Sequence, residues 1–109
     1  MTYLGKTYLV DRFDLSMFEL PVETDVTAGM DIRAVKTEVA QRYLSKGFTS
    51  AVETAENASL FSEILGIPVE GNRIAVALEV GDKVVVGLRE GEGMKWVYIS
   101  FHIQKWFIP

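Results

Sequence analysis

The chain has 109 residues, 49% of them hydrophobic and 24% charged, a composition that predicts one soluble globular domain spanning residues 1–109. It contains no cysteine and one histidine, His102, which excludes disulfides and thiolate zinc sites and makes a histidine-rich metal site a poor prospect. The formal net charge of −4 is opposite in sign to the basic surface that binds duplex nucleic acid.

The start of the sequence lacks the charged segment and apolar run of a secretion signal. No apolar stretch is long enough to cross a membrane. We therefore expect a cytoplasmic protein that makes no contact with a membrane.

The first predicted element is a strand over Lys6–Val10, which is rich in strand-forming residues and leads into a polar turn at Asp11. A second short strand is expected within Glu19–Thr27. Next, Asp31 is a suitable helix cap, because the apolar residues after it recur every three or four positions. This spacing predicts a helix that stops at Gly47, with Ile32, Val35, Val39 and Tyr43 on its apolar face.

A second helix is predicted downstream, with two possible starts. Ser50 and Glu53 have the spacing of a capping box, while Thr54 and Asn57 offer a competing start. The helix is expected to end at Gly66, because glycine commonly terminates helices. Its apolar stripe comprises Leu60, Phe61, Ile64 and Leu65.

The next segment predicts a hairpin. Apolar residues alternate through residues 74–78, a turn is expected at Gly81 and Asp82, and Lys83–Leu88 would form the antiparallel partner strand.

The C-terminal run has the alternation of one more strand, with two different faces. One face is purely apolar and belongs in the core; the other is too aromatic for a face in water, which predicts that it is covered, as a dimer interface or as the floor of a ligand site. The first face carries Val97, Ile99, Phe101 and Ile103, and the second carries Trp96, Tyr98, Ser100, His102 and Gln104.

A family resemblance is carried by residues 47–73, which read GFTSAVETAENASLFSEILGIPVEGNR. This stretch resembles the viral ring nucleases, type III anti-CRISPR proteins of archaeal viruses and bacterial mobile elements. The resemblance implies an α+β fold with a small mixed, mainly antiparallel sheet and two helices on one face. It also implies a homodimer in the host-cell cytoplasm that binds cyclic tetra-adenylate across its two-fold axis. The family cleaves this ring without a metal or cofactor, by attack of a ribose 2′-hydroxyl on the adjacent phosphate.

The family's ligand-binding positions map onto several residues of this chain. Its Asn-Arg strand matches Asn72 and Arg73, and Arg89 matches a later arginine if a short deletion is allowed. In the loop after the first strand, Ser16 corresponds to a neutral residue of the family, whereas Asp11 stands where a neutral residue is expected and should repel a phosphate.

The family's catalytic histidine is missing. Relatives continue Thr-Ser-Ala-Ile with Gly-His, whereas Val52 is followed here by Glu53 and Thr54. That imidazole is the general acid of the family, and a positioned general acid contributes roughly a hundred- to ten-thousand-fold in rate. The hydroxyl of Thr54 is too weak an acid to replace it.

Each candidate residue also has an ordinary structural interpretation. Arg73 could bind phosphate or be a surface charge, and Arg89 could pair with a neighbouring Glu90 or Glu92. Ser50, Thr54 and Asn57 could bind an anion at the helix start or simply cap the helix. Glu53 and His102 are the remaining candidate acids, but Glu53 fits a capping box and His102 fits a packed interface.

The sequence therefore favours a counter-defence protein that binds and sequesters a cyclic oligoadenylate-type messenger in a dimer pocket. One alternative is an active, metal-independent ring nuclease that relies on positioning or on a relocated acid. The other is a protein-binding module that kept the fold and lost the ligand.

Overall fold

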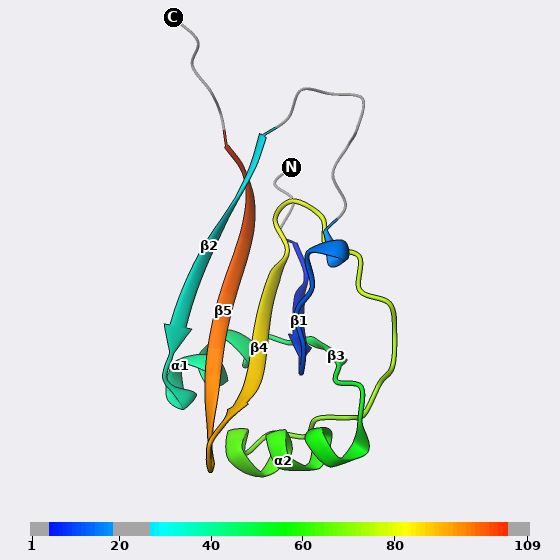
Figure 1. Cartoon of the computed structure of the whole chain (residues 1–109), viewed down its shortest axis with the longest axis vertical. Coiled ribbons are helices and arrows are strands. Elements are labelled where there is room, and N and C mark those ends of the chain that lie inside the picture. Colours follow the sequence, from blue (N-terminus) through cyan, green and yellow to red (C-terminus); the bar gives the residue numbers. More distant parts are fainter. Residues whose placement is uncertain (1–4, 19–26, 105–109) are drawn as a thin grey trace, which may run out of the picture.

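The computed structural model describes residues 5–18 and 27–104, which form one five-stranded sheet and two α-helices (Figure 1). In chain order the elements are β1 (Thr7–Val10), the short 3-10 helix Leu15–Met17, β2 (Thr27–Val35), α1 (Thr37–Leu44), β3 (Thr49–Ala51), α2 (Ala55–Leu65), β4 (Lys83–Glu90) and β5 (Gly93–Gln104).

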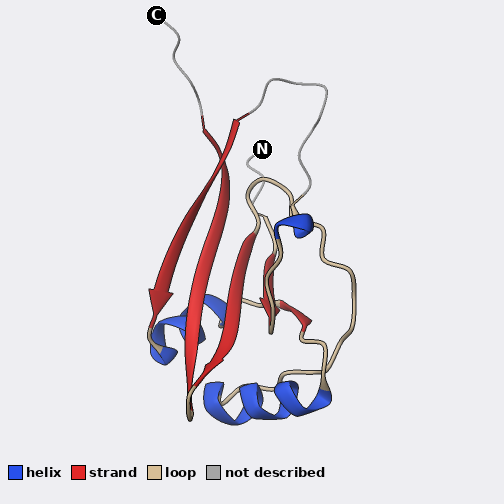
Figure 2. Ribbon diagram, in the orientation of Figure 1, coloured by secondary structure: helices blue, strands red, loops and turns tan. Residues whose placement is uncertain are grey.

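The sheet is mixed and mainly antiparallel. Its strand order is β2-β5-β4-β1-β3. β1 pairs in parallel with β3 and β4, while the long β5 pairs antiparallel with β2 and β4. Both helices lie toward the end of the sheet where β1, β2 and β4 finish (Figure 2). The predicted α+β fold is thereby confirmed.

The core on the helix side of the sheet is built around two aromatic rings. Phe61 of α2 meets Trp96 of β5 edge to face, with ring centroids 5.1 Å apart. Gly87 of β4 makes room for both rings, because a Cβ there would lie 2.5 Å from Phe61 and 2.6 Å from Trp96. Other buried members of this core are Leu9, Ala40, Leu44, Val52, Ala58, Leu65, Val69 and Val85.

The opposite face of the sheet is covered by loops. Phe18 follows the 3-10 helix and packs its ring 4.5 Å from that of Phe101 in β5. Leu78 lies beside it, since its N–H donates a hydrogen bond to the Met17 carbonyl. Beneath these loops the sheet buries Tyr8, Val10, Val84, Val86 and Ile99. The alternating side chains of β1, β4 and β5 therefore fill two cores.

The helix predicted from Asp31 is wrong in its first part. Residues Thr27–Val35 form β2, which pairs with β5 over nine positions, and α1 begins at Thr37. The apolar spacing fitted a helix, but pairing with the long β5 strand decides the conformation, because strand preference depends strongly on tertiary context. The short strand predicted within residues 19–27 lies outside the described residues except for Thr27, the first residue of β2.

The start of the second helix follows the competing prediction. The Thr54 hydroxyl accepts a hydrogen bond from the Asn57 N–H, so Thr54 is the N-cap of α2. The capping box of Ser50 and Glu53 is wrong, because Ser50 belongs to β3. The end at Gly66 is confirmed by its left-handed conformation, with φ of 69°.

The predicted hairpin partner of β4 is also wrong. Residues 72–77 are irregular, and β4 pairs with β1 and β5 instead. The alternation of apolar residues has another cause, since Val76 and Leu78 pack with the loop-side core. The expected turn is present, with Asp82 N–H donating to the Glu79 carbonyl, and the antiparallel hairpin is formed by β4 and β5 around Gly91 and Glu92.

The aromatic face of β5 is covered in part by the helices of the same chain. Trp96 is buried in the helix-side core, and Tyr98 stacks on Tyr43 of α1 with ring centroids 3.8 Å apart. The His102 side chain, farther along the same face, is 44% exposed. Among the described residues, no helix is long and apolar enough to span a bilayer.

Candidate functional site

The candidate site lies where β1 and β3 end. These strands are parallel, so the loops that follow them leave the sheet at the same edge. Asp11 follows β1, and Glu53 and Thr54 connect β3 to α2. The segment after α2 returns to this point, because Gly71 forms a bridge with Val52.

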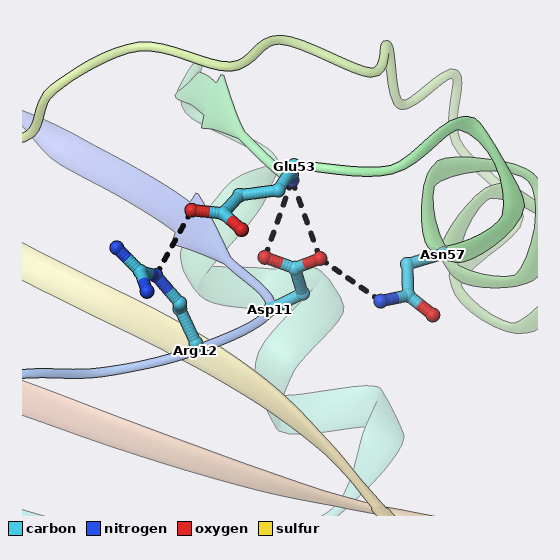
Figure 3. A network of polar contacts seen from close by, with 4 residues as sticks. All are labelled: Asp11, Arg12, Glu53 and Asn57. Atoms are coloured by element: carbon cyan, nitrogen blue, oxygen red, sulfur yellow. Dashed lines mark hydrogen bonds and ion pairs between the residues drawn. The ribbon is translucent and has the colours of Figure 1, made fainter.

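Asp11 joins the first loop to the start of α2 (Figure 3). Its two carboxylate oxygens each accept a hydrogen bond of 3.2 Å from the main-chain N–H of Glu53. One of them also accepts a hydrogen bond of 2.9 Å from the side-chain amide of Asn57. A carboxylate beside a helix N-terminus is favourable, because the amide groups there carry partial positive charge. Asp11 thus supplies an anion from the chain itself at the start of α2.

Glu53 is held by a second contact. Its carboxylate lies 2.9 Å from Nε of Arg12, and the two side chains are 30% and 65% exposed, respectively. Figure 3 shows the Glu53 side chain directed toward Arg12, while its main chain faces Asp11. Both the main chain and the carboxylate of Glu53 therefore have partners within the protein.

A cleft of about 230 Å³ opens beside this network on the loop-covered side of the sheet. Asp14 stands in its wall and accepts a hydrogen bond of 2.9 Å from the Ser16 N–H. The hydrogen bonds from the Ser16 backbone and hydroxyl lower the pKa of Asp14, so its carboxylate stays charged near neutrality. The cleft is lined by Arg12, Asp14, Ser16, Met17, Ala51, Glu53, Ile74, Ala75 and Val76.

Ser50 and Asn72 are engaged in tying the chain after α2 to β3. The Ser50 hydroxyl donates to the Glu70 carbonyl at 2.6 Å, and the Asn72 amide donates to the Ser50 carbonyl at 2.8 Å. The Asn72 N–H also donates to the Val52 carbonyl. Arg73 follows this anchored residue and is exposed, but it does not begin a strand as predicted.

Arg89 and His102 have acidic partners at different places. Arg89 lies 3.3 Å from Glu56 in the first turn of α2, which brings it to the side of the candidate site. The predicted pairing with a neighbouring Glu90 or Glu92 is wrong. His102 lies 3.5 Å from Asp31, where β5 extends past the first residue of β4. This is the opposite end of the sheet, so His102 does not join the candidate site.

The sequence prediction therefore identified some residues of the site and missed others. Asp11, Glu53, Thr54 and Asn57 do meet at the start of α2. Arg12 was not singled out, although its position beside Asp11 in a polar loop was an available signal. The cleft wall at residues 74–76 was missed because that segment was taken as a strand. No cluster of three metal-ligating side chains occurs among the residues that the structure describes.

Replacing Asp11 with alanine is expected to lower the free energy of unfolding by about 1.5–3 kcal/mol, because hydrogen bonds to a charged group and the donors left behind have that magnitude. The stability of Asp11→Asn, which retains one oxygen acceptor, should lie between those of the unaltered protein and Asp11→Ala. Urea unfolding measures the difference, with Glu92→Ala in the exposed β4–β5 turn as the control. Equal stability of Asp11→Ala and Glu92→Ala would contradict a structural role for Asp11.

These features define a small α+β protein whose candidate cleft opens where two parallel strands end. A family model described as STIV B116-like matches residues 15–91, more than half of the chain. The chain therefore belongs to the STIV B116-like family.

The structure also resembles a solved viral protein, B116 of Sulfolobus turreted icosahedral virus (STIV). The TM-score is 0.68, and the two share 17% sequence identity over 88% of this chain and 99% of that chain. At this level of identity the likeness concerns the fold. A search of curated proteins finds no match.

Proposed function

We propose that this protein is a counter-defence protein that binds a cyclic oligoadenylate-type second messenger and sequesters it without rapid cleavage. The proposal rests on the contacts made by the residues that stand where the viral ring nucleases have their catalytic motif. Thr54 caps α2, Glu53 pairs with Arg12, and Asn57 donates to Asp11. Each group is used in a contact within the fold, and none supplies the transferable proton of the missing histidine.

Binding of a phosphate-bearing ring is supported by the arginines around the candidate site. Arg12 lines the cleft, Arg73 precedes its wall at Ile74, and Arg89 reaches the first turn of α2. Guanidinium groups suit phosphate oxygens, since they donate two parallel hydrogen bonds. Because Asp11 occupies the start of α2, the phosphates of the ring are expected to bind these arginines instead.

A homodimer is part of this proposal, because a two-fold pocket suits a symmetric ring. The edge strand β2 exposes Met30 and Ile32, and the exposed Leu88 of β4 lies on the same side of the sheet. These residues offer a more apolar contact surface than the face bearing Tyr98, Ser100 and His102. Light scattering is expected to show a dimer that Ile32→Asp weakens; a monomer at high concentration would contradict the shared pocket.

The decisive experiment is incubation with a panel of cyclic oligonucleotides, followed by chromatography of the bound fraction after heat release. Recovery of an intact ring supports sequestration. Linear products would favour the alternative of an active ring nuclease. Recovery of no ligand would favour a protein-binding module. The observation that supports this alternative is the place of Asp11, because its carboxylate occupies the start of α2, where an anion would otherwise be favoured.

Arg73→Ala is expected to weaken binding of the cyclic ligand by about 1.5–3 kcal/mol, the contribution of a charge-assisted hydrogen bond, without changing the melting temperature. Calorimetry measures the affinity and thermal unfolding measures the stability. The matched control is Lys95→Ala, an exposed cation on β5. Unchanged affinity of Arg73→Ala would return Arg73 to the role of a surface charge.

A further inference from the structure

A second cleft, of about 300 Å³, lies beside the first residues of strands β1 and β4. Thr7 and Lys83, the first residues of β1 and β4, contribute to it, whereas the candidate site described above lies where β1 and β3 end. This second cleft is lined by Thr7, Arg42, Tyr43, Ser45, Lys46, Lys83 and Tyr98.

The cleft has an aromatic wall. The rings of Tyr43 and Tyr98 are stacked, with an interplanar angle of 9°, and both side chains are half-buried. Burial and the neighbouring Tyr43 raise the pKa of Tyr98, and the positive charge of Arg33 acts in the opposite direction. Arg33 lies directly opposite Tyr98 in the register of β2 and β5, and its charge acts on the Tyr98 phenol. The wall thus offers a rigid planar surface next to a positive charge.

Four of the eleven lysines and arginines gather around this wall, although the whole chain is negatively charged. Within residues 5–18 and 27–104, none of the four forms an ion pair. Arg42 and Lys46 follow the ordinary preference for cations at the end of a helix, here α1. That preference does not account for Lys83 and Arg33, which come from strands β4 and β2.

We propose that this cleft is a second ligand site that binds a nucleoside polyphosphate, with its phosphates on Arg42, Lys46 and Lys83 and its base against the tyrosine pair. Cations from separate elements attract a compact polyanion, and aromatic rings hold a nucleobase by stacking or edge contact. The volume is at the lower end of the range for small-molecule pockets, roughly 300–1,000 Å³, which suits a mononucleotide. This site does not depend on the proposed binding of a cyclic messenger.

The test is isothermal calorimetry of the full chain with ATP, adenosine and tripolyphosphate, without divalent cations. ATP is expected to bind more tightly than either of the other two, because only ATP uses both the cations and the aromatic wall. Absence of ATP binding would overturn the proposal. Tripolyphosphate binding as tight as that of ATP would overturn the assignment of the base to the tyrosines.

Variants then locate the binding. Lys83→Gln and Lys46→Gln are each expected to weaken ATP binding by roughly tenfold or more, the loss of one contact to a charged group. Lys95→Gln is the control, since Lys95 is an exposed cation of β5 that lines neither cleft. If Lys83→Gln and Lys46→Gln bind ATP as tightly as the control variant does, the proposed site is overturned. Weaker ATP binding by Arg73→Ala would place the nucleotide at the candidate site and overturn the second site, which separates this test from that of the cyclic messenger.

Discussion

Introducing the histidine of the viral ring nucleases, by Thr54→His together with Glu53→Gly, is expected to raise single-turnover cleavage of cyclic tetra-adenylate by roughly a hundredfold or more. A positioned general acid contributes about a hundred- to ten-thousand-fold, and the ordinary histidine pKa of about 6.5 lets the ring donate a proton near neutrality. Glycine at position 53 restores the backbone freedom of the family's motif. It also releases Arg12 from its ion pair with Glu53.

The structure sets the control for this experiment. Thr54 caps α2, so replacing it removes a cap whose contribution is about 0.5–2 kcal/mol. The double variant Thr54→Asn with Glu53→Gly retains a capping side chain without an imidazole. Rapid product formation by the histidine variant alone supports lost general-acid catalysis. Unchanged cleavage despite retained ligand binding would show that the motif does not face the scissile phosphate.

Phe61→Ala is expected to lower the free energy of unfolding by about 3–5 kcal/mol, because Phe61 is a large buried core residue. Phe61 is 1% exposed and fills the space between α2, Gly87 and Trp96. Alanine would leave a cavity that the sheet cannot close, because Gly87 has no side chain with which to fill it. Chemical denaturation measures the loss.

The matched control is Leu15→Ala, a large apolar residue that is 67% exposed. Its substitution is expected to change stability by about 0.5 kcal/mol or less, because little apolar surface returns to water. Similar losses for Phe61→Ala and Leu15→Ala would mean that Phe61 does not anchor α2 on the sheet.

Local patterns were sufficient where a segment's own residues decide its structure. The strand-forming residues of β1, the alternation of β5 and the glycine after α2 each predicted an element that the structure contains. Side-chain alternation fixes which residues of β5 share a face, whatever covers that face. The α+β class came from the resemblance over residues 47–73 together with these elements.

Local patterns failed where distant segments compete for the same residues. Residues 31–35 have apolar spacing that suits a helix, yet they form β2 because β5 offers nine positions of strand pairing. Residues 74–78 alternate like a strand, yet β1 and β5 already occupy both edges of β4. In each case the choice depends on which hydrogen-bonding edge is free, and this is a property of the assembled sheet.

The sequence by itself determined which residue types the candidate site contains. Only the tertiary structure decided what Asp11 does: a carboxylate expected to repel a phosphate instead accepts hydrogen bonds from Glu53 and Asn57. The contact spans 46 positions along the chain and exists because β1 and β3 end side by side. Likewise, Lys83 and Tyr98 lie beside Lys46 only because folding brings β4, β5 and the end of α1 together. Residue types fix the available chemistry, whereas strand order fixes which groups meet.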